Sequence, residues 1–381
     1  MPKEVIVQSS LEAVEIIETP IPTPSDKEVV IKVAVAGTNP KDWKYPHWKG
    51  ISMNSGDDLS GVVHSVGKDV YEFKPGDRVA AFHQCFTENG SFAEYSIAPD
   101  WMTFLIPPNV SFEEAATIPT AAVTAAVGLY IDMKLPPPFD PIKPVEGGKK
   151  MPILINGVSS AVGAFAAKFA RLSGLGPIIG VAGRSSDFGK SLVDYIIDYR
   201  KGEDALVASI EDILTKEGLG TKVPYVFDAI SENGSLEATL RYVDLNGGVI
   251  STVQSPQLFA IDKENFKYPD GVTAINSMAP TLFSTHKDFG YLWSRYLGRL
   301  LEDGRLKPHP YEVIPGGLKG VLTGLRNLMD GKASAVKYVY KIDDTGDIAV
   351  GLRVADVKNM RDPAGTSTHH APPKLMDFPM P

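Results

Sequence analysis

The sequence is poor in cysteine, in net positive charge and in long apolar runs, and each shortage excludes a class of function. The single cysteine, Cys85, cannot form an internal disulfide, which is typical of a reducing compartment. The net charge of −8 at pH 7 leaves no broad basic surface for a phosphate backbone. The N-terminal residues, MPKEVIVQSS, contain no apolar core of signal-peptide length. We therefore expect a cytoplasmic protein that binds no nucleic acid.

The longest uncharged stretch is AATIPTAAVTAAVGLYI, residues 115–131, and Pro119 interrupts it. It falls short of the ~20 apolar residues that a spanning helix needs, so it predicts a buried helix and no membrane association. Ser111 and Glu114 precede it at the spacing of a capping box, which marks the start of that helix.

The apolar pattern changes along the chain and predicts two kinds of folding unit. Residues 1 to about 100 carry short β-branched runs separated by turns, such as EVVIKVAVAG and DRVAAF, which indicate an all-β, barrel-like unit. From residue 151 onward, apolar strands alternate with helices as far as GVTAINSMAPTLF (271–283), read as a strand. This alternation predicts a parallel sheet with helices on both faces, followed by a long helix and a final helix and strand.

Two proline-rich stretches stand apart from this pattern. Residues 134–150, KLPPPFDPIKPVEGGKK, cannot form a helix or a central strand and predict a surface insertion. The tail RDPAGTSTHHAPPKLMDFPMP, residues 361–381, predicts a segment without regular structure.

The stretch MPILINGVSSAVGAFAAKFARLSG, residues 151–174, has the strand, small-residue loop and helix of a dinucleotide-binding fold. Gly157 suits the tight turn and Gly163 suits close packing of the helix on the sheet, whereas Ser160 replaces the usual middle glycine. The predicted cofactor-binding residues of this loop are Gly157, Ser159, Ser160, Ala161, Val162 and Gly163.

The end of the next strand indicates which dinucleotide binds. An acidic residue there would select NAD, but GVAGRSSDFGK offers Arg184, Ser185 and Lys190, with Tyr199 further on. These are donors for a 2′-phosphate, and Asp187 lies beyond the strand end. We therefore predict NADPH as the cofactor.

An ordered set of motifs over about 340 residues resembles the medium-chain dehydrogenase/reductase superfamily. The matching stretches are GTNPKDWKY, GDDLSGVVHSVGKDVYEFKPGDRV, GSFAEYSIAP, AATIPTAAVTAAVGLY, ILINGVSSAVG and DGKASAVKYVYKI. The chain is most similar to the zinc-independent quinone oxidoreductase and enoyl reductase branch, and within it to fungal trans-acting enoyl reductases and their ToxD-like relatives. The resemblance implies an α/β protein in which a GroES-like catalytic domain (1–128 and 286–381) is split around a Rossmann domain (129–285).

The resemblance also argues against a zinc enzyme. Zinc-dependent members carry a cysteine where this chain has Asn39 and a histidine where it has Asp57. With Cys85 as the sole cysteine, neither a catalytic nor a structural zinc site can assemble from its usual ligands. We expect no metal, and His83 beside Cys85 is interpreted as a structural pair.

The chemistry implied without a metal is hydride addition to an activated C=C bond, with donors near the carbonyl oxygen to stabilise the enolate. By the resemblance, Tyr45 is a proton-donor candidate, Lys44 and Thr120 line the substrate site, and Asn39 lies in the same motif. Other readings stay open: Asn39 and Asp42 as loop-fixing residues, Lys44 as a solvated charge and Tyr45 as packing.

Three functions remain in competition. The first is NADPH-dependent reduction of an enoyl thioester, enone or enal. The second is quinone reduction. The third is a low-turnover, cofactor-binding partner of a synthase. The expected partners are a small α,β-unsaturated carbonyl compound and an acyl carrier or synthase. The chain is expected to be a monomer or a homodimer, the latter pairing through residues 271–283.

Overall fold

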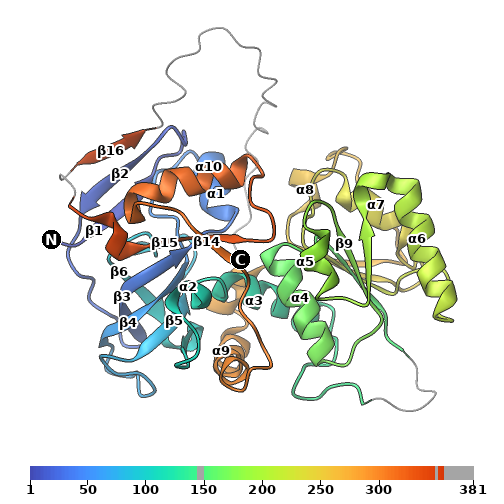
Figure 1. Cartoon of the computed structure of the whole chain (residues 1–381), viewed down its shortest axis with the longest axis horizontal. Helices are drawn as coiled ribbons and strands as arrows, with labels where there is room; N and C mark the ends of the chain where they lie inside the picture. The colour runs from blue at the N-terminus through green and yellow to red at the C-terminus, as the bar shows by residue number, and fades with distance from the viewer. Residues whose placement is uncertain (144–149, 348–350, 356–381) are drawn as a thin grey trace, which may run out of the picture. The chain divides into compact units, whose positions relative to one another are not determined.

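The computed structural model describes residues 1–143, 150–347 and 351–355. The predicted tail at 361–381 and part of the predicted insertion, 144–149, therefore lie outside the described residues. The chain divides into two compact units (Figure 1): unit 1 comprises Met1–Thr120 and Pro280–Pro381, and unit 2 comprises Ala121–Ala279. The sequence placed the domain boundaries after residues 128 and 285, whereas the chain passes from one unit to the other after Thr120 and again after Ala279.

Unit 1 is built on two β-sheets. One is antiparallel, in the order β1-β2-β16, and the other has seven strands in the order β14-β15-β3-β4-β5-β7, with β6 also paired to β3. The bounds are β1 Lys3–Val7, β2 Ala13–Glu18, β3 Glu28–Gly37, β4 Asp58–Val66, β5 Arg78–Phe82, β6 Tyr95–Pro99, β7 Thr103–Leu105, β14 Tyr311–Val313, β15 Lys337–Lys341 and β16 Leu352–Ala355. The β-branched runs of the first hundred residues thus form strands, as the sequence predicted.

Unit 1 also contains helices, and one that the sequence did not predict matters for the site. The helix α1 (Lys41–Lys49) lies between β3 and β4, inside the stretch expected to be all-β, whereas α9 (Lys287–Glu302) and α10 (Val321–Met329) are the long helix and the later helix that the sequence predicted. Short 3₁₀ segments complete this unit: η1 Asp100–Met102, η4 Ala279–Phe283 (which crosses the unit boundary), η5 Gly317–Gly320 and η6 Ile342–Thr345. The helix α1 has little apolar periodicity to reveal it, and Pro46 sits inside it.

The capping box at Ser111 is present, but the helix after it is interrupted. Ser111 Oγ accepts the N–H of Glu114, and the Glu114 carboxylate accepts the N–H of Ser111. The helix α2 (Phe112–Ala115) then ends, and α3 (Pro119–Ala126) begins at the proline and continues as the π-helical η2 (Val127–Asp132). Among the described residues, the helical segment Phe112–Asp132 is long and apolar enough to cross a membrane. Of its most apolar 18 residues, 78% are buried inside the fold. Such burial is typical of a core helix.

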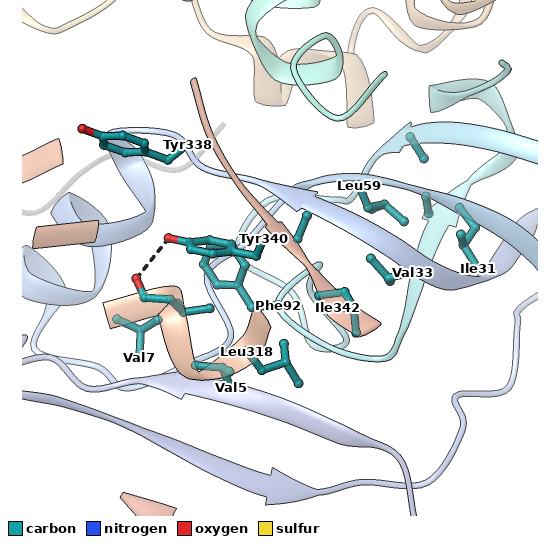
Figure 2. Close-up of a cluster of buried hydrophobic side chains, with 14 of the residues drawn as sticks. Val5, Val7, Ile31, Val33, Leu59, Phe92, Leu318, Tyr338, Tyr340 and Ile342 are labelled. Atoms are coloured by element: carbon teal, nitrogen blue, oxygen red, sulfur yellow. Dashed lines mark hydrogen bonds between the residues drawn. The ribbon is translucent and has the colours of Figure 1, made fainter. Parts of the chain in front are cut away.

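The core of unit 1 gathers around Tyr340 of β15 (Figure 2). Its ring meets Phe92 edge-on, with centroids 5.5 Å apart, and its hydroxyl donates to the Val321 carbonyl oxygen at 3.0 Å. A Cβ on Gly324 of α10 would lie 2.1 Å from the Tyr340 hydroxyl, so only glycine admits this packing. The cluster anchors α10 onto β15 and ties it to the N-terminal strands, which contribute Val5 and Val7.

Unit 2 is a six-stranded parallel sheet in the order β10-β9-β8-β11-β12-β13. In chain order this is 3-2-1-4-5-6, the arrangement of a Rossmann dinucleotide-binding fold. Its strands are β8 Ile153–Asn156, β9 Ile178–Ala182, β10 Tyr195–Asp198, β11 Tyr225–Asp228, β12 Val249–Thr252 and β13 Thr273–Asn276. Its helices are α4 Ala161–Leu172, α5 Ser186–Lys190, η3 Tyr199–Lys201, α6 Glu203–Lys216, α7 Ser235–Tyr242 and α8 Pro256–Phe259. The predicted α/β class is confirmed.

One predicted strand of unit 2 is too long. The stretch 271–283 was read as a single strand, but β13 ends at Asn276 and η4 follows. The strand stops with its partner, because the pairing of β12 with β13 ends at Thr252 opposite Asn276, and Pro280 lies in the η4 turn that follows. The strand β13 lies at the edge of the sheet, paired with β12 within the described residues. Homodimer formation through it stays a prediction.

Candidate functional site

The centre of the polar site in unit 1 is the carboxylate of Asp58, at the start of β4. It is fully buried and accepts four hydrogen bonds. Oδ1 accepts the Thr120 backbone N–H at 2.7 Å and the Thr120 hydroxyl at 2.6 Å. Oδ2 accepts the Asn39 side-chain amide at 2.9 Å and the Lys337 ammonium. Lys337 also donates to Asn39 Oδ1 at 2.9 Å, so the buried charge is paired and its hydrogen bonds are satisfied.

This arrangement brings together two of the predicted site residues. Asn39 and Thr120 are 81 positions apart in the sequence, but in the folded chain both side chains donate to the Asp58 carboxylate. Their polar side-chain atoms are engaged by Asp58 and Lys337, which fits the loop-fixing reading of Asn39. Both residues therefore hold the site in shape, whatever else they contact.

A second buried charge cluster surrounds Lys41, the first residue of α1. Its ammonium contacts the Asp57 carboxylate, lies 3.1 Å from Asp42 Oδ1 and donates to the Ser55 carbonyl oxygen at 2.6 Å. The Cys85 thiol donates to Asp57 Oδ2 at 3.0 Å. Three acceptors thus contact one ammonium group, and the Lys41 side chain stays 26% exposed.

The burial of this cluster shifts its ionisation. Burial raises the pKa of Asp42 to about 7, and Asp57 adds to the rise while the Lys41 ammonium opposes it. Burial lowers the pKa of Lys41, but Asp57 and Asp42 outweigh it and hold the pKa above its ordinary value. Burial, together with Asp57, raises the pKa of the Cys85 thiol well above its usual range, so Cys85 is a neutral donor here.

Asn39 and Asp57 stand at the two positions where zinc-dependent members of the superfamily carry zinc ligands. In this chain Asn39 is hydrogen-bonded to Asp58 and Lys337, and Asp57 is paired with Lys41. His83 donates through Nδ1 to the Ile97 carbonyl oxygen at 2.7 Å. Over residues 1–143, 150–347 and 351–355, no three His, Cys, Asp or Glu side chains are grouped to hold a metal ion. The donor set does not fit a zinc centre.

The helix α1 also carries Lys44 and Tyr45. Lys44 is 6% exposed, and its ammonium lies 5.7 Å from the Trp43 ring centroid and 5.8 Å from that of Trp48. The reading of Lys44 as a solvated charge is therefore wrong, because the two indole rings cover it. The Tyr45 ring packs on Phe86 with centroids 3.9 Å apart.

The Tyr45 hydroxyl is a free donor within the part of the chain that the structure describes. It makes no hydrogen bond there, and burial raises the pKa of Tyr45, so the group is protonated near neutral pH.

The proline inside α1 leaves one helix carbonyl without its usual donor. Pro46 has no N–H to bond the Asp42 carbonyl oxygen, and the Ser55 hydroxyl donates to that oxygen instead at 2.7 Å. The helix can therefore turn at Pro46 without leaving a buried carbonyl unpaired.

In unit 2, a tight glycine turn joins β8 to α4. Gly157 adopts φ +70°, and a Cβ on Gly163 would lie 2.3 Å from the Gly157 carbonyl oxygen, so α4 approaches the strand as closely as glycine permits. Ser160 caps α4, since its Oγ accepts the Gly163 N–H at 3.1 Å. Ala161 and Val162 form the first turn of α4. The serine in place of the middle glycine is thus used to start the helix.

The structure ties this loop to the one after β9. The Ser159 hydroxyl donates to the Ser185 carbonyl oxygen at 2.8 Å. Gly183 lies against the Tyr199 ring, where a Cβ would come within 2.7 Å. Lys190 instead forms an exposed ion pair with Asp187 at 2.8 Å. Of the predicted 2′-phosphate donors, Ser185 thus contacts the loop after β8 and Tyr199 contacts the loop after β9. Lys190 is paired with Asp187.

A Rossmann sheet with a glycine turn, in one chain with a β-rich unit, defines a medium-chain dehydrogenase/reductase. The alcohol dehydrogenase GroES-like domain matches residues 25–108. The trans-enoyl reductase fsr4 of Gibberella fujikuroi is 40% identical over 328 residues, covering 84% of this chain and 92% of its own. The trans-enoyl reductase resD of Aspergillus sclerotiorum is 32% identical, covering 85% and 96%.

A solved structure agrees on the fold. A putative zinc-dependent alcohol dehydrogenase from Rhizobium etli superposes with a TM-score of 0.73 at 21% identity, covering 89% of this chain and 98% of that one. At this identity the likeness concerns the fold alone. The chain itself belongs to the trans-enoyl reductase family within the medium-chain dehydrogenase/reductase superfamily.

Sequence reasoning missed the residues that organise the unit 1 site. Lys337 and Asp58 were not singled out, and Lys41 passed as an unremarked residue of its motif. The available signal was the pair of adjacent acids, Asp57 and Asp58, at the point where β4 begins, because buried carboxylates require paired cations. The cations themselves, Lys41 for Asp57 and Lys337 for Asp58, could be identified only from the folded structure.

Proposed function

We propose that this protein is an NADPH-dependent reductase of activated carbon–carbon double bonds in an enoyl thioester, enone or enal, and that it acts without zinc. The observation that carries the proposal is the 40% identity to a trans-enoyl reductase across most of both chains. The absence of zinc from the mechanism is supported by the donor set at Asn39 and Asp57, which an amide and an ion pair occupy.

The residues of unit 2 fit a dinucleotide. The left-handed Gly157 and the close approach at Gly163 leave backbone N–H groups at the start of α4, where a pyrophosphate is stabilised. Arg184, Ser185 and Tyr199 would hold the 2′-phosphate that distinguishes NADPH from NADH. When bound, NADPH supplies the hydride for the reduction. The loop from Gly157 to Gly163, with Ser159, Ser160, Ala161 and Val162, would contact its phosphates.

The side chains of unit 1 would handle the charge and the proton. Reduction at the β-carbon leaves negative charge on the carbonyl oxygen of the substrate, which hydrogen-bond donors stabilise. Tyr45, protonated and with a free hydroxyl among the described residues, would donate the proton. The Lys44 ammonium, covered by Trp43 and Trp48, would add positive charge to the substrate site. Thr120 and Asn39 would position this face of the site through Asp58.

The partner and location form part of the same proposal. The substrate would be a small α,β-unsaturated carbonyl compound, free or delivered by an acyl carrier or a synthase. The support is the name of the relatives, trans-enoyl reductases. The proposed cytoplasmic location is supported by the lone cysteine, Cys85.

The test is NADPH oxidation against an enoyl thioester, a free enal and a quinone, with NADH as the control cofactor. Turnover of the thioester or the enal, faster with NADPH than with NADH, would support the proposal. Turnover of the quinone alone would replace it with a quinone oxidoreductase. Tight NADPH binding with no turnover of any acceptor would point to a cofactor-binding partner of a synthase.

A further inference from the structure

A buried carboxylate in unit 2 has no part in the proposed chemistry, yet it lies next to the cofactor loop. Asp228 ends β11, which pairs with β8 so that Asp228 is opposite Asn156. Asn156 is the residue before Gly157. The loop that follows Asp228, residues 229–234, therefore leaves the sheet beside the glycine turn.

Asp228 holds this loop through four hydrogen bonds. Oδ1 accepts the backbone N–H groups of Ile230 at 3.0 Å and Ser231 at 3.1 Å, together with the Asn156 side-chain amide at 3.0 Å. Oδ2 accepts the Ser235 hydroxyl at 2.8 Å. The side chain is fully buried, and burial raises its pKa while these bonds oppose the rise. The carboxylate thus connects β8, the loop and the start of α7.

The loop is held in a conformation that it would not adopt unaided. Ser231 has φ +53° and Asn233 has φ +56°, in the left-handed region that costs free energy for residues with a Cβ. The Ser231 hydroxyl donates to the Asp228 carbonyl oxygen at 2.8 Å and accepts the Val253 N–H at 2.9 Å. These bonds fix the loop between β11 and β12.

The fixed loop presses Ile230 against the glycine turn. A Cβ on Gly157 would lie 2.5 Å from both Cγ1 and Cδ1 of Ile230, so the isoleucine fills the space that a side chain at position 157 would take. The Ala229 N–H also donates to the Asn156 carbonyl oxygen at 3.0 Å. The shape of the turn and the position of Ile230 are interlocked.

We propose that Asp228 and Ile230 are positioning residues for the cofactor: Asp228 fixes the loop, and Ile230 holds the Gly157 turn in the form that binds the dinucleotide phosphates. This inference rests on the proposed function, because it assumes that NADPH binds at this turn. It assigns a role to two residues that contact the turn from a different strand and supply no phosphate donor of their own.

The experiment is an equilibrium titration with NADPH, followed by nicotinamide fluorescence without substrate, on Ile230→Ala. The matched control is Ile213→Ala, a half-buried isoleucine that packs on the apolar cluster between α6 and the sheet. We expect Ile230→Ala to raise the Kd for NADPH about tenfold, which is about 1.4 kcal/mol, and the control to leave it unchanged. The KM for NADPH should rise with it while kcat at saturation stays constant.

A coupled variant separates positioning from general loosening. Asp228→Ala should raise the Kd as Ile230→Ala does, and the double variant should bind no more weakly than either alone, because both act through one contact. Equal Kd values for Ile230→Ala and Ile213→Ala would overturn the inference even if Asp228→Ala fails to fold. Additive losses in the double variant would overturn it as well. Failure of the unchanged protein to bind NADPH would instead refute the proposed function.

Discussion

The ion pair between Lys337 and Asp58 provides the sharpest test of how unit 1 is held together. Both side chains are buried, 3% and 0% exposed, and Lys337 also supports Asn39. In Lys337→Met, the Asp58 carboxylate keeps its three neutral donors but loses its only cationic partner among the described contacts. Removing one member of a buried pair costs about 3–5 kcal/mol, because the remaining charge is left without compensation in a low-dielectric interior.

The assay is urea unfolding followed by tryptophan fluorescence. All 4 tryptophans, Trp43, Trp48, Trp101 and Trp293, lie in unit 1, so the signal reports the unfolding of that unit. The free energy of unfolding of Lys337→Met should fall by the amount estimated above, at an unchanged denaturant slope.

The control removes a surface ion pair from the same unit. Lys332 lies 2.9 Å from Asp330, and the two side chains are 59% and 48% exposed. Because solvent screens such a pair, Lys332→Met should cost less than about 1 kcal/mol. The double variant Lys337→Met with Asp58→Asn should recover part of the loss, since no charge is then left buried. Equal costs for the two lysine variants would refute the reasoning.

Three further outcomes are expected. The raised pKa of Asp42, about 7 in the folded chain against 3.8 ordinarily, means that the folded state binds this proton more tightly, so stability falls as pH rises between those values. As the pH rises from about 5 to about 8, the free energy of unfolding measured in urea should therefore fall for the unchanged protein relative to that of Asp42→Asn. A difference between the two proteins that does not change with pH would contradict this. Ser160→Ala should lose about 1 kcal/mol from the α4 cap and Ser160→Gly only a few tenths, read as faster hydrogen exchange at Gly163; equal exchange rates would mean that the cap does not stabilise α4. Tyr45→Phe should lower kcat about 100-fold at an unchanged unfolding midpoint, because its hydroxyl has no recorded partner in the described residues, and retained turnover would remove Tyr45 from the mechanism.

The elements that the sequence predicted well are those whose signal is local. The strands β8 and β9 are short apolar runs, and Gly157 and Gly163 report backbone geometry that few other residues tolerate. The capping box at Ser111 is likewise a contact over three residues. Each of these depends on neighbours in the chain, so the pattern alone is sufficient.

The elements that it missed depend on context. The sequence of α1, KDWKYPHWK, has a proline inside and no apolar stripe, and it stays helical because Ser55 takes over the bond that Pro46 cannot make. The expected single helix over 115–131 starts at Pro119, where φ is already suited to a helix and the missing N–H has no partner to lose. The last strand of unit 2 is shorter than expected because its pairing with β12 ends at Thr252 and Asn276.

By itself, the sequence determined the α/β class through its periodicity and the turn at Gly157 through backbone sterics, and its ordered motifs indicated the superfamily. Only the tertiary structure decided the charge network of unit 1. Gly37 pairs with Asp58 across one edge of β3 and with Val339 across the other, and this places Lys337 next to a carboxylate 279 residues away. A buried charge selects its partner through the sheet register, and register is a property of the folded chain.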